Sequence, residues 1–562
     1  MNIDKLYRLK ITKSQFLTLF FILSSMTVFA QEEWEKNDGE IEDVEIEIVK
    51  DREITLPKAN RNFEKIPPTS LTKNTGQFEY FFSNLNLPLP ALNIRVRPLR
   101  IKGEPLSKLY GNYVKAGFGN YTTPYLEGYF TSKRNETQLY GAHLNFINSK
   151  NGPVHSDNSG SGALDLEIFG KYFGKKTTAS GEVGFNRESY HFYGYDEGQL
   201  IGADSLKQNF NDVFVKGYLE NTDKGSKLQY LTGFRFDYLK DNYEAVESEL
   251  QLDFKGNYEL GEQSKFNLDL DYDLISQKDE LIEVKSRNIF RATPTVTFEY
   301  EGFLINAGFN AVYENDTLSD SDELHFYPMA RAQYTLPSGF RVYAGIRGDV
   351  EKLTLRKLVG ENPFINANTR AFNSYKTFEF FGGIDGNLSS KLGFGAGVSI
   401  ANYQNMYFFV NDPADQSKFI VIYDTGNTAL VNIFGELSYN RNDELRFVMR
   451  GDYWGYSTDK SAEAWHRPNY KVSAISTYKL FDKLRFEAEV FTLGGIQAFD
   501  ATSVETVKLK AAFDLNFTTE YLFSQQFSAF VRLNNIFAKE YELLYRYPTR
   551  SFQFMIGATY SF

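Results

Sequence analysis

The chain ends with residues 551–562, which read SFQFMIGATYSF. Apolar and polar side chains alternate along this stretch, with Met555 as the exception. A period of two is typical of a β-strand with one apolar face, because successive side chains point to opposite faces. The apolar face carries Phe552, Phe554, Ile556, Ala558, Tyr560 and Phe562. The sequence therefore predicts a terminal strand that places one face against lipid or a core.

The same alternation recurs from residue 109 to the end, for example over 250–260, 266–274 and 507–517. Charged residues occupy the polar positions, which predicts a face in contact with water. Short polar turns alternate with longer linkers, as in outer-membrane barrels. The turns are Lys133–Asn135, Gly174–Lys175, Thr222–Gly225, Gly261–Gln263, Pro337–Gly339, Ser389–Lys391, Arg441–Asp443 and Asp482–Lys483. The linkers include Ser149–Gly160, Tyr195–Lys207, Asp316–Glu323, Arg356–Asn373 and Asn405–Asn427.

Counting the alternating runs predicts an all-β fold over residues 109–562, a transmembrane antiparallel β-barrel of about 22 strands. The spacing leaves room for spanning strands of roughly 9–11 residues. A soluble propeller or a string of sandwiches would have strands of about 5–6 residues and, for a propeller, a repeated blade motif. The composition, with 51 Phe and 37 Tyr but 3 Trp, also favours a strand-rich membrane protein. A net charge of -11 argues against a nucleic-acid ligand.

The N-terminal part has two predicted sections. Residues 1–30 resemble a cleaved signal peptide, with four basic residues before an apolar stretch that is too short to span a membrane and ends at Ala30. Residues 31–108 form a proline-rich segment whose first part is strongly acidic, with eleven acids between Glu32 and Glu53. Such a composition predicts an extended periplasmic segment, which could also fill part of the barrel lumen. The chain has no cysteine, which excludes disulfides and thiolate metal sites.

The C-terminal end resembles the last two strands of TonB-dependent receptors. The resemblance rests on residues 531–537 (VRLNNIF), residues 539–542 (KEYE), Tyr547-Pro548, Arg550 and residues 557–562 (GATYSF). It implies a 22-stranded barrel in the outer membrane of a Gram-negative bacterium, within outer-membrane lipids. Phe562, with Tyr560, is similar to the terminal signal that the barrel-assembly machinery reads. The 78 residues from Gln31 to Lys108 are too few for the complete plug domain of those receptors.

Candidate functional residues fall into two groups. The first is Val44, Ile46 and Ile48, which alternate with acids and could add a strand to a periplasmic partner protein; an acidic solvated tail is the alternative. The second is a set of charged residues on predicted polar strand faces, expected to line the lumen. These residues are Asp269, Asp271, Asp273, Arg446, Arg450, Arg485 and Glu487.

No catalytic, cofactor or metal site is expected. The five histidines show no suggestive spacing, and the acidic run Asp316–Glu323 lacks the glycine of a calcium loop. The leading hypothesis is a transport-type barrel, resembling a TonB-dependent receptor without a full plug, that admits or binds a nutrient with partner proteins. The alternative is a non-transporting subunit that scaffolds an outer-membrane assembly or export complex. A barrel hydrolase is the third.

Overall fold

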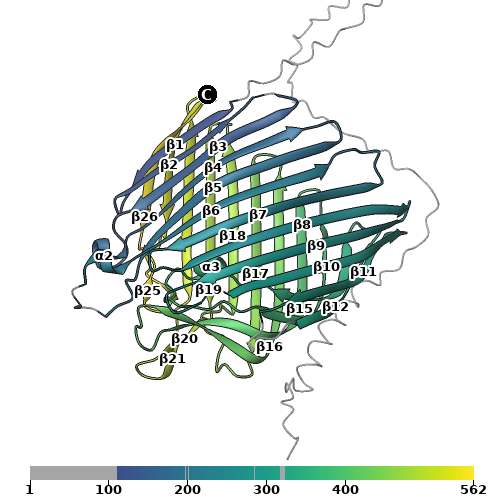
Figure 1. The fold of residues 1–562 in the computed structure, drawn as a ribbon. Coiled ribbons are helices and arrows are strands. Elements are labelled where there is room, and N and C mark those ends of the chain that lie inside the picture. The colour runs from purple at the N-terminus through teal and green to yellow at the C-terminus, as the bar shows by residue number, and fades with distance from the viewer. Residues whose placement is uncertain (1–109, 134, 197, 200, 284, 317–322) are drawn as a thin grey trace, which may run out of the picture. The chain divides into compact units, whose positions relative to one another are not determined.

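The structure, a computed structural model, describes residues 110–562 except 134, 197, 200, 284 and 317–322. Twenty-two strands form one antiparallel sheet, and the first strand of this sheet pairs with the last. The sheet is therefore a closed barrel (Figure 1), and the predicted count of about 22 strands is confirmed. The predicted signal peptide and the segment 31–108 lie outside the described residues.

The first half of the barrel wall comprises eleven strands of 8–16 residues. They are β1 (Asn112–Gly119), β2 (Thr123–Thr131), β3 (Gln138–Ser149), β4 (Ser161–Phe173), β5 (Thr177–His191), β6 (Lys207–Asn221), β7 (Leu228–Asp241), β8 (Val246–Gly261), β9 (Ser264–Lys278), β10 (Lys285–Tyr300) and β11 (Phe303–Glu314).

The second half comprises eleven more strands of the same sheet. They are β12 (Glu323–Thr335), β13 (Arg341–Glu351), β14 (Ser374–Asn387), β15 (Leu392–Asn411), β16 (Phe419–Arg441), β17 (Leu445–Ser457), β18 (Tyr470–Leu480), β19 (Leu484–Gly494), β22 (Ala512–Leu522), β23 (Phe527–Asn534) and β26 (Gln553–Ser561).

The remaining elements are small and belong to the connections. Two strand pairs lie outside the wall: β20 (Gln497–Asp500) with β21 (Glu505–Lys508), and β24 (Glu542–Leu544) with β25 (Tyr547–Pro548). Three short helices complete the part of the chain that the structure describes: η2 (Ser156–Ser159), α2 (Ala203–Leu206) and α3 (Leu355–Glu361). No helix among the described residues is long and apolar enough to cross a membrane.

The two ends of the barrel differ in their connections. The barrel closes where Tyr113 on β1 pairs with Ser561 on β26, so both ends of the wall lie at one rim. All eight predicted short turns lie at this rim, and the long connections lie at the opposite rim. One linker is wrong: within 405–427 only residues 412–418 are a connection, because β15 continues to Asn411 and β16 begins at Phe419. These strand ends are apolar on both faces, since Phe408, Phe409 and Phe419 are all buried, so they lack the usual alternation.

The two faces of the wall have opposite character. On β8, Leu252 is exposed on the outer face, while Glu247 and Glu249 are buried on the other. On β4, Ile168 is 69% exposed and pairs with Ala142 and Val183. Exposed large apolar side chains of this kind recur on nearly every strand of the wall. An apolar outer surface of this extent is suited to contact with lipid.

The long connections pack together around a hydrophobic cluster, which we call the loop cluster. Its buried members come from four connections and the adjacent strand ends: Phe192, Leu206, Phe210, Leu239, Ala245, Leu353, Leu355, Leu358, Val359, Phe364, Ile365, Ala371, Tyr407, Phe409, Phe419 and Tyr547. Burial of this many apolar side chains stabilises the connections as one packed unit.

Candidate functional site

The connection between β13 and β14, residues 352–373, is bound to the inner face of the wall at β7 to β10; we call it the inner loop. Its helix α3 begins at Leu355 because the Thr354 side chain accepts a hydrogen bond of 3.1 Å from the Lys357 amide. Leu355, Leu358 and Val359 are buried in the loop cluster. One side of the helix therefore packs on apolar neighbours, and the other faces the charged wall.

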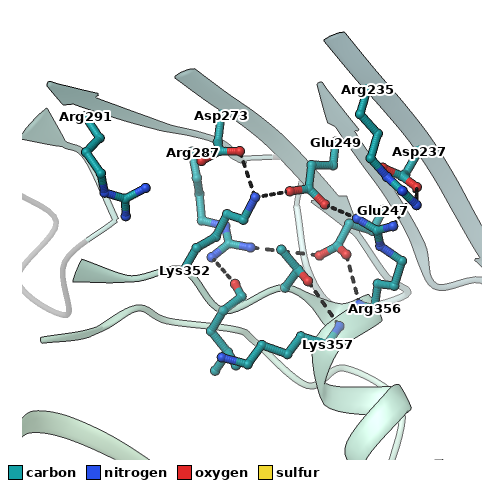
Figure 2. Close-up of polar contacts among 12 residues, drawn as sticks. Arg235, Asp237, Glu247, Glu249, Asp273, Arg287, Arg291, Lys352, Arg356 and Lys357 are labelled. Atoms are coloured by element: carbon teal, nitrogen blue, oxygen red, sulfur yellow. Dashed lines mark hydrogen bonds and ion pairs between the residues drawn. The ribbon is translucent and has the colours of Figure 1, made fainter. Parts of the chain in front are cut away.

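Two cations of the inner loop bind carboxylates of three neighbouring wall strands (Figure 2). Arg356 donates hydrogen bonds of 2.5 Å to Asp237 on β7 and 2.5 Å to Glu249 on β8. Lys352 donates 2.7 Å to Asp273 on β9 and also contacts the second oxygen of Glu249. Asp237, Glu249 and Asp273 are each at most 3% exposed. The loop supplies positive charge and the wall supplies negative charge.

Glu247 on β8 holds the backbone at the start of α3. Its carboxylate oxygens accept hydrogen bonds of 2.7 Å from the Leu355 amide and 3.0 Å from the Arg356 amide. Amides of the first helical turn have no partner within the helix, and the helix dipole favours an anion at this end. Glu247 thus accepts hydrogen bonds from two amides that have no acceptor within the helix.

Arg287 on β10 joins the two ends of the inner loop. Its Nη1 donates hydrogen bonds to the carbonyls of Leu353 (2.9 Å) and Ala371 (2.8 Å) and to Asp316 (2.7 Å). Arg287 is 4% exposed. Asp316 is also buried, and Arg287 provides its counter-charge inside the protein. Both ends of the loop are therefore bound to a single buried side chain.

These ion pairs are buried, so each partner depends on the other. Removal of water strengthens the attraction between the charges, but it makes an unpaired charge costly. Burial alone would lower the pKa of Lys352, but Glu249 and Asp273 raise it above its ordinary value. Lys352 consequently stays charged in its binding site.

The apolar side of the inner loop contacts other connections. Phe364 stacks on Tyr547 with 3.7 Å between ring centroids, and Ile365 forms a parallel bridge with Phe419. The adjacent His466 bridges two segments: its Nδ1 lies 2.8 Å from the Phe409 carbonyl, and its Nε2 lies 3.3 Å from the amide of Tyr545. The loops are thus held by apolar contacts as well as charges.

Only one of the candidate lumen residues enters this network. Asp273 binds Lys352, while Asp269 and Asp271 lie further along the same face of β9. The other four lie on β17 and β19, away from the inner loop. Arg450 contacts Glu436 and Asp452, Arg485 lies 3.7 Å from Glu520, and Arg446 is paired in register with Asn440 and Thr477. Glu487 lines a cavity of about 360 Å³ together with Arg485.

The other predicted site residues divide between described and undescribed parts. Val44, Ile46 and Ile48 lie outside the described residues. Tyr560 and Phe562 are exposed, and their rings stack at 5.6 Å. Their role as an assembly signal stays a prediction. Within the described residues, no group of three or more His, Asp or Glu side chains is arranged to hold a metal ion.

Sequence reasoning missed the residues that bind the inner loop: Lys352, Arg356, Arg287, Asp237, Glu247 and Glu249. The period-two pattern places Asp237, Glu247 and Glu249 on polar faces, which was the available signal. Their partners come from a connection, where no periodicity indicates direction.

Solved structures that resemble this chain include iron and siderophore receptors. The FrpB iron transporter from Neisseria meningitidis superposes with a TM-score of 0.65 at 11% identity, over 81% of this chain and 82% of that one. The siderophore receptor PirA from Pseudomonas aeruginosa superposes with a TM-score of 0.56 at 14% identity, over 80% of this chain and 79% of that one. The ferric-catecholate import receptor Fiu from Escherichia coli superposes with a TM-score of 0.61 at 9% identity, over 81% of this chain and 82% of that one.

The chain has the barrel fold of the TonB-dependent receptors. No family model and no curated protein matches the sequence. At 9–14% identity the likeness shows the fold alone, so the inner loop has to be interpreted from its own contacts.

Proposed function

We propose that this protein is a transport-type barrel of the Gram-negative outer membrane, that it admits or binds a nutrient with the help of partner proteins, and that the inner loop is its gate. The apolar outer face and the likeness to receptor barrels support the membrane location and the transport class. The terminal pair Tyr560 and Phe562 would serve recognition by the assembly machinery.

The observation that carries the proposal is the binding of the inner loop to the wall by side chains of opposite charge. Lys352 and Arg356 are the loop cations that bind the wall, and the wall offers Asp237, Glu249 and Asp273. The other side of the loop packs in the loop cluster. A partner or solute that competes for the charges can release the loop from the wall, because a ligand shifts an equilibrium by its differential affinity for the two states.

Conductance of the purified full-length protein in planar bilayers tests the gate. The double variant Lys352→Gln/Arg356→Gln is expected to raise the mean conductance several-fold over the parent protein, because the loop loses the two cations that bind the wall carboxylates. The control Lys224→Gln/Lys391→Gln has the same charge change in two short turns at the opposite rim and is expected to conduct like the parent. Equal conductance of all three proteins would contradict the gate.

A second candidate function, a scaffold for an outer-membrane assembly or export complex, is favoured by the seam between β12 and β13. Only residues Ala330–Thr335 of β12 pair with β13. Among the described residues, the first part of β12, Glu323–Met329, therefore pairs with β11 but not with β13. A strand edge without a partner can accept a strand of another chain. Purification from native membranes in mild detergent discriminates: a second barrel in constant ratio would favour the scaffold, and a lone conducting barrel would favour transport.

A further inference from the structure

A cavity of about 470 Å³ lies between the loop cluster and the inner face of β19, β22 and β26. Its size is within the range of small-molecule sites, about 300–1,000 Å³. Tyr193 and Phe364 line it from the loops, and Phe491 lines it from β19. Aromatic rings on both sides offer a planar ligand an apolar slot.

The cavity is also lined by Arg550, a half-buried cation without a carboxylate partner among the described residues. Its Nη2 donates a hydrogen bond of 2.9 Å to the Ser161 hydroxyl, and its guanidinium lies 5.7 Å from the centre of the Tyr121 ring. Its Nε has no hydrogen-bond partner in the described part of the chain, and no described carboxylate lies within 4.0 Å. Partial burial lowers the pKa of Arg550. The two arginines that bind the inner loop, Arg287 and Arg356, are by contrast paired with carboxylates.

A carboxylate on the cavity wall limits the charge of any ligand. Asp514 on β22 is 2% exposed, and its Oδ1 accepts a hydrogen bond of 2.6 Å from the Leu515 amide. A ligand with several negative charges would be repelled by Asp514. A ligand with a single negative charge can place that charge on Arg550, whose planar fork matches a carboxylate.

We propose that this cavity is a binding site for a small, singly charged organic carboxylate with a planar, aromatic body. The guanidinium group of Arg550 binds the carboxylate. Tyr193, Phe364 and Phe491 hold the ring, and Asp514 selects against ligands with more than one negative charge. The site does not require transport, but Phe364 belongs to the inner loop, so the cavity has this lining only while that loop is in the position described here.

Calorimetric titration of the full-length protein in detergent tests the site with 4-hydroxybenzoate as the probe. Its neutral counterpart, 4-hydroxybenzamide, has nearly the same shape and is expected to bind at least tenfold more weakly. Arg550→Gln is expected to weaken binding of 4-hydroxybenzoate at least tenfold, and Arg550→Lys by less. Arg485→Gln, which removes a wall arginine far from the cavity, is expected to change it less than twofold.

Several outcomes would overturn the site. They are the absence of binding at millimolar 4-hydroxybenzoate, equal binding of the acid and the amide, and unchanged binding in Arg550→Gln. Inorganic phosphate bound as tightly as 4-hydroxybenzoate would show a general anion site instead. If Arg550→Gln does not fold, as judged by its mobility on unheated gels, Phe491→Ala decides: it is expected to weaken both aromatic probes at least fivefold, and unchanged affinity would refute the site.

Discussion

Arg356 on helix α3 donates a hydrogen bond of 2.5 Å to Glu249 on strand β8, across 107 residues of sequence. Both side chains belong to the network that binds the inner loop to the wall (Figure 2). Glu249 is also bound by Lys352, so one carboxylate binds two cations of the loop. This relationship makes the loop position sensitive to single substitutions.

Arg356→Ala is expected to destabilise the barrel by about 3–5 kcal/mol, because it leaves Asp237 and Glu249 buried with less compensation. The double variant Arg356→Ala/Glu249→Ala should cost less than the sum of the two single variants, since the residues are coupled. Urea-dependent unfolding in detergent or lipid vesicles measures both. Arg450→Ala is the control, because its ion pairs are more exposed and should contribute about 0–1 kcal/mol. If the destabilisation of the double variant equals the sum of those of Arg356→Ala and Glu249→Ala, the coupling is contradicted.

His466 is expected to make the packing of the loops dependent on pH. Burial, together with the positive charge of Arg467, lowers its pKa from 6.5 to about 4. Between these values the unfolded chain binds more protons than the folded loops, so the stability that neutral His466 contributes is present above about pH 6.5 and is lost as the pH falls toward 4.

The fluorescence of buried Trp465 reports this change in a Trp34→Phe/Trp454→Phe background, which removes the other two tryptophans. A transition between pH 6.5 and 4 is expected in this protein and in the control His155→Gln, and it should disappear in His466→Gln. If the transition persists in His466→Gln, another titrating group causes it.

A disulfide between the inner loop and β16 is expected to hold the gate closed. Ile365 and Phe419 are bridge partners, so their Cα atoms lie within the usual separation of a disulfide. The chain has no native cysteine to interfere. Adding Ile365→Cys/Phe419→Cys to the double variant Lys352→Gln/Arg356→Gln should return its bilayer conductance to the parent level, and reductant should raise it again. Each single cysteine variant is the control. If addition of reductant does not change the conductance of the disulfide variant, movement of this loop is contradicted.

A charge placed on the outer face should be costly in a membrane. Ile168→Arg places a cation near the middle of β4, and the expected loss is about 2–4 kcal/mol in vesicle folding assays if the site lies near the bilayer midplane. Thr518→Arg, on the inner face of β22, is expected to cost far less because that face does not meet lipid. Equal effects of the two variants would refute the assignment of the faces.

The strand number illustrates what local pattern can predict. Each wall strand buries or exposes its faces alternately, so the period of two marks it without knowledge of its neighbours. The prediction failed over 405–427, where Phe408 and Phe419 are buried in different clusters and the alternation is lost. Residues Asp269, Asp271 and Asp273 were grouped correctly on one strand face. The pattern could not tell that Asp273 would be covered by Lys352 from the inner loop.

The sequence by itself determined about 22 strands, their short and long connections and the polarity of their two faces, because alternation and turns depend on residues near one another in the chain. Closure of the barrel pairs Tyr113 on β1 with Ser561 on β26, at the two ends of the wall. Only the tertiary structure decided that residues 352–373 bind inside the wall and that Arg550 lines a cavity without a counter-charge. Alternation indicates which face of the wall a strand side chain occupies. The residue that binds it lies in a connection, where the sequence has no periodicity. Contacts such as Arg356 with Glu249 exist only once the wall has brought distant strands around the loop.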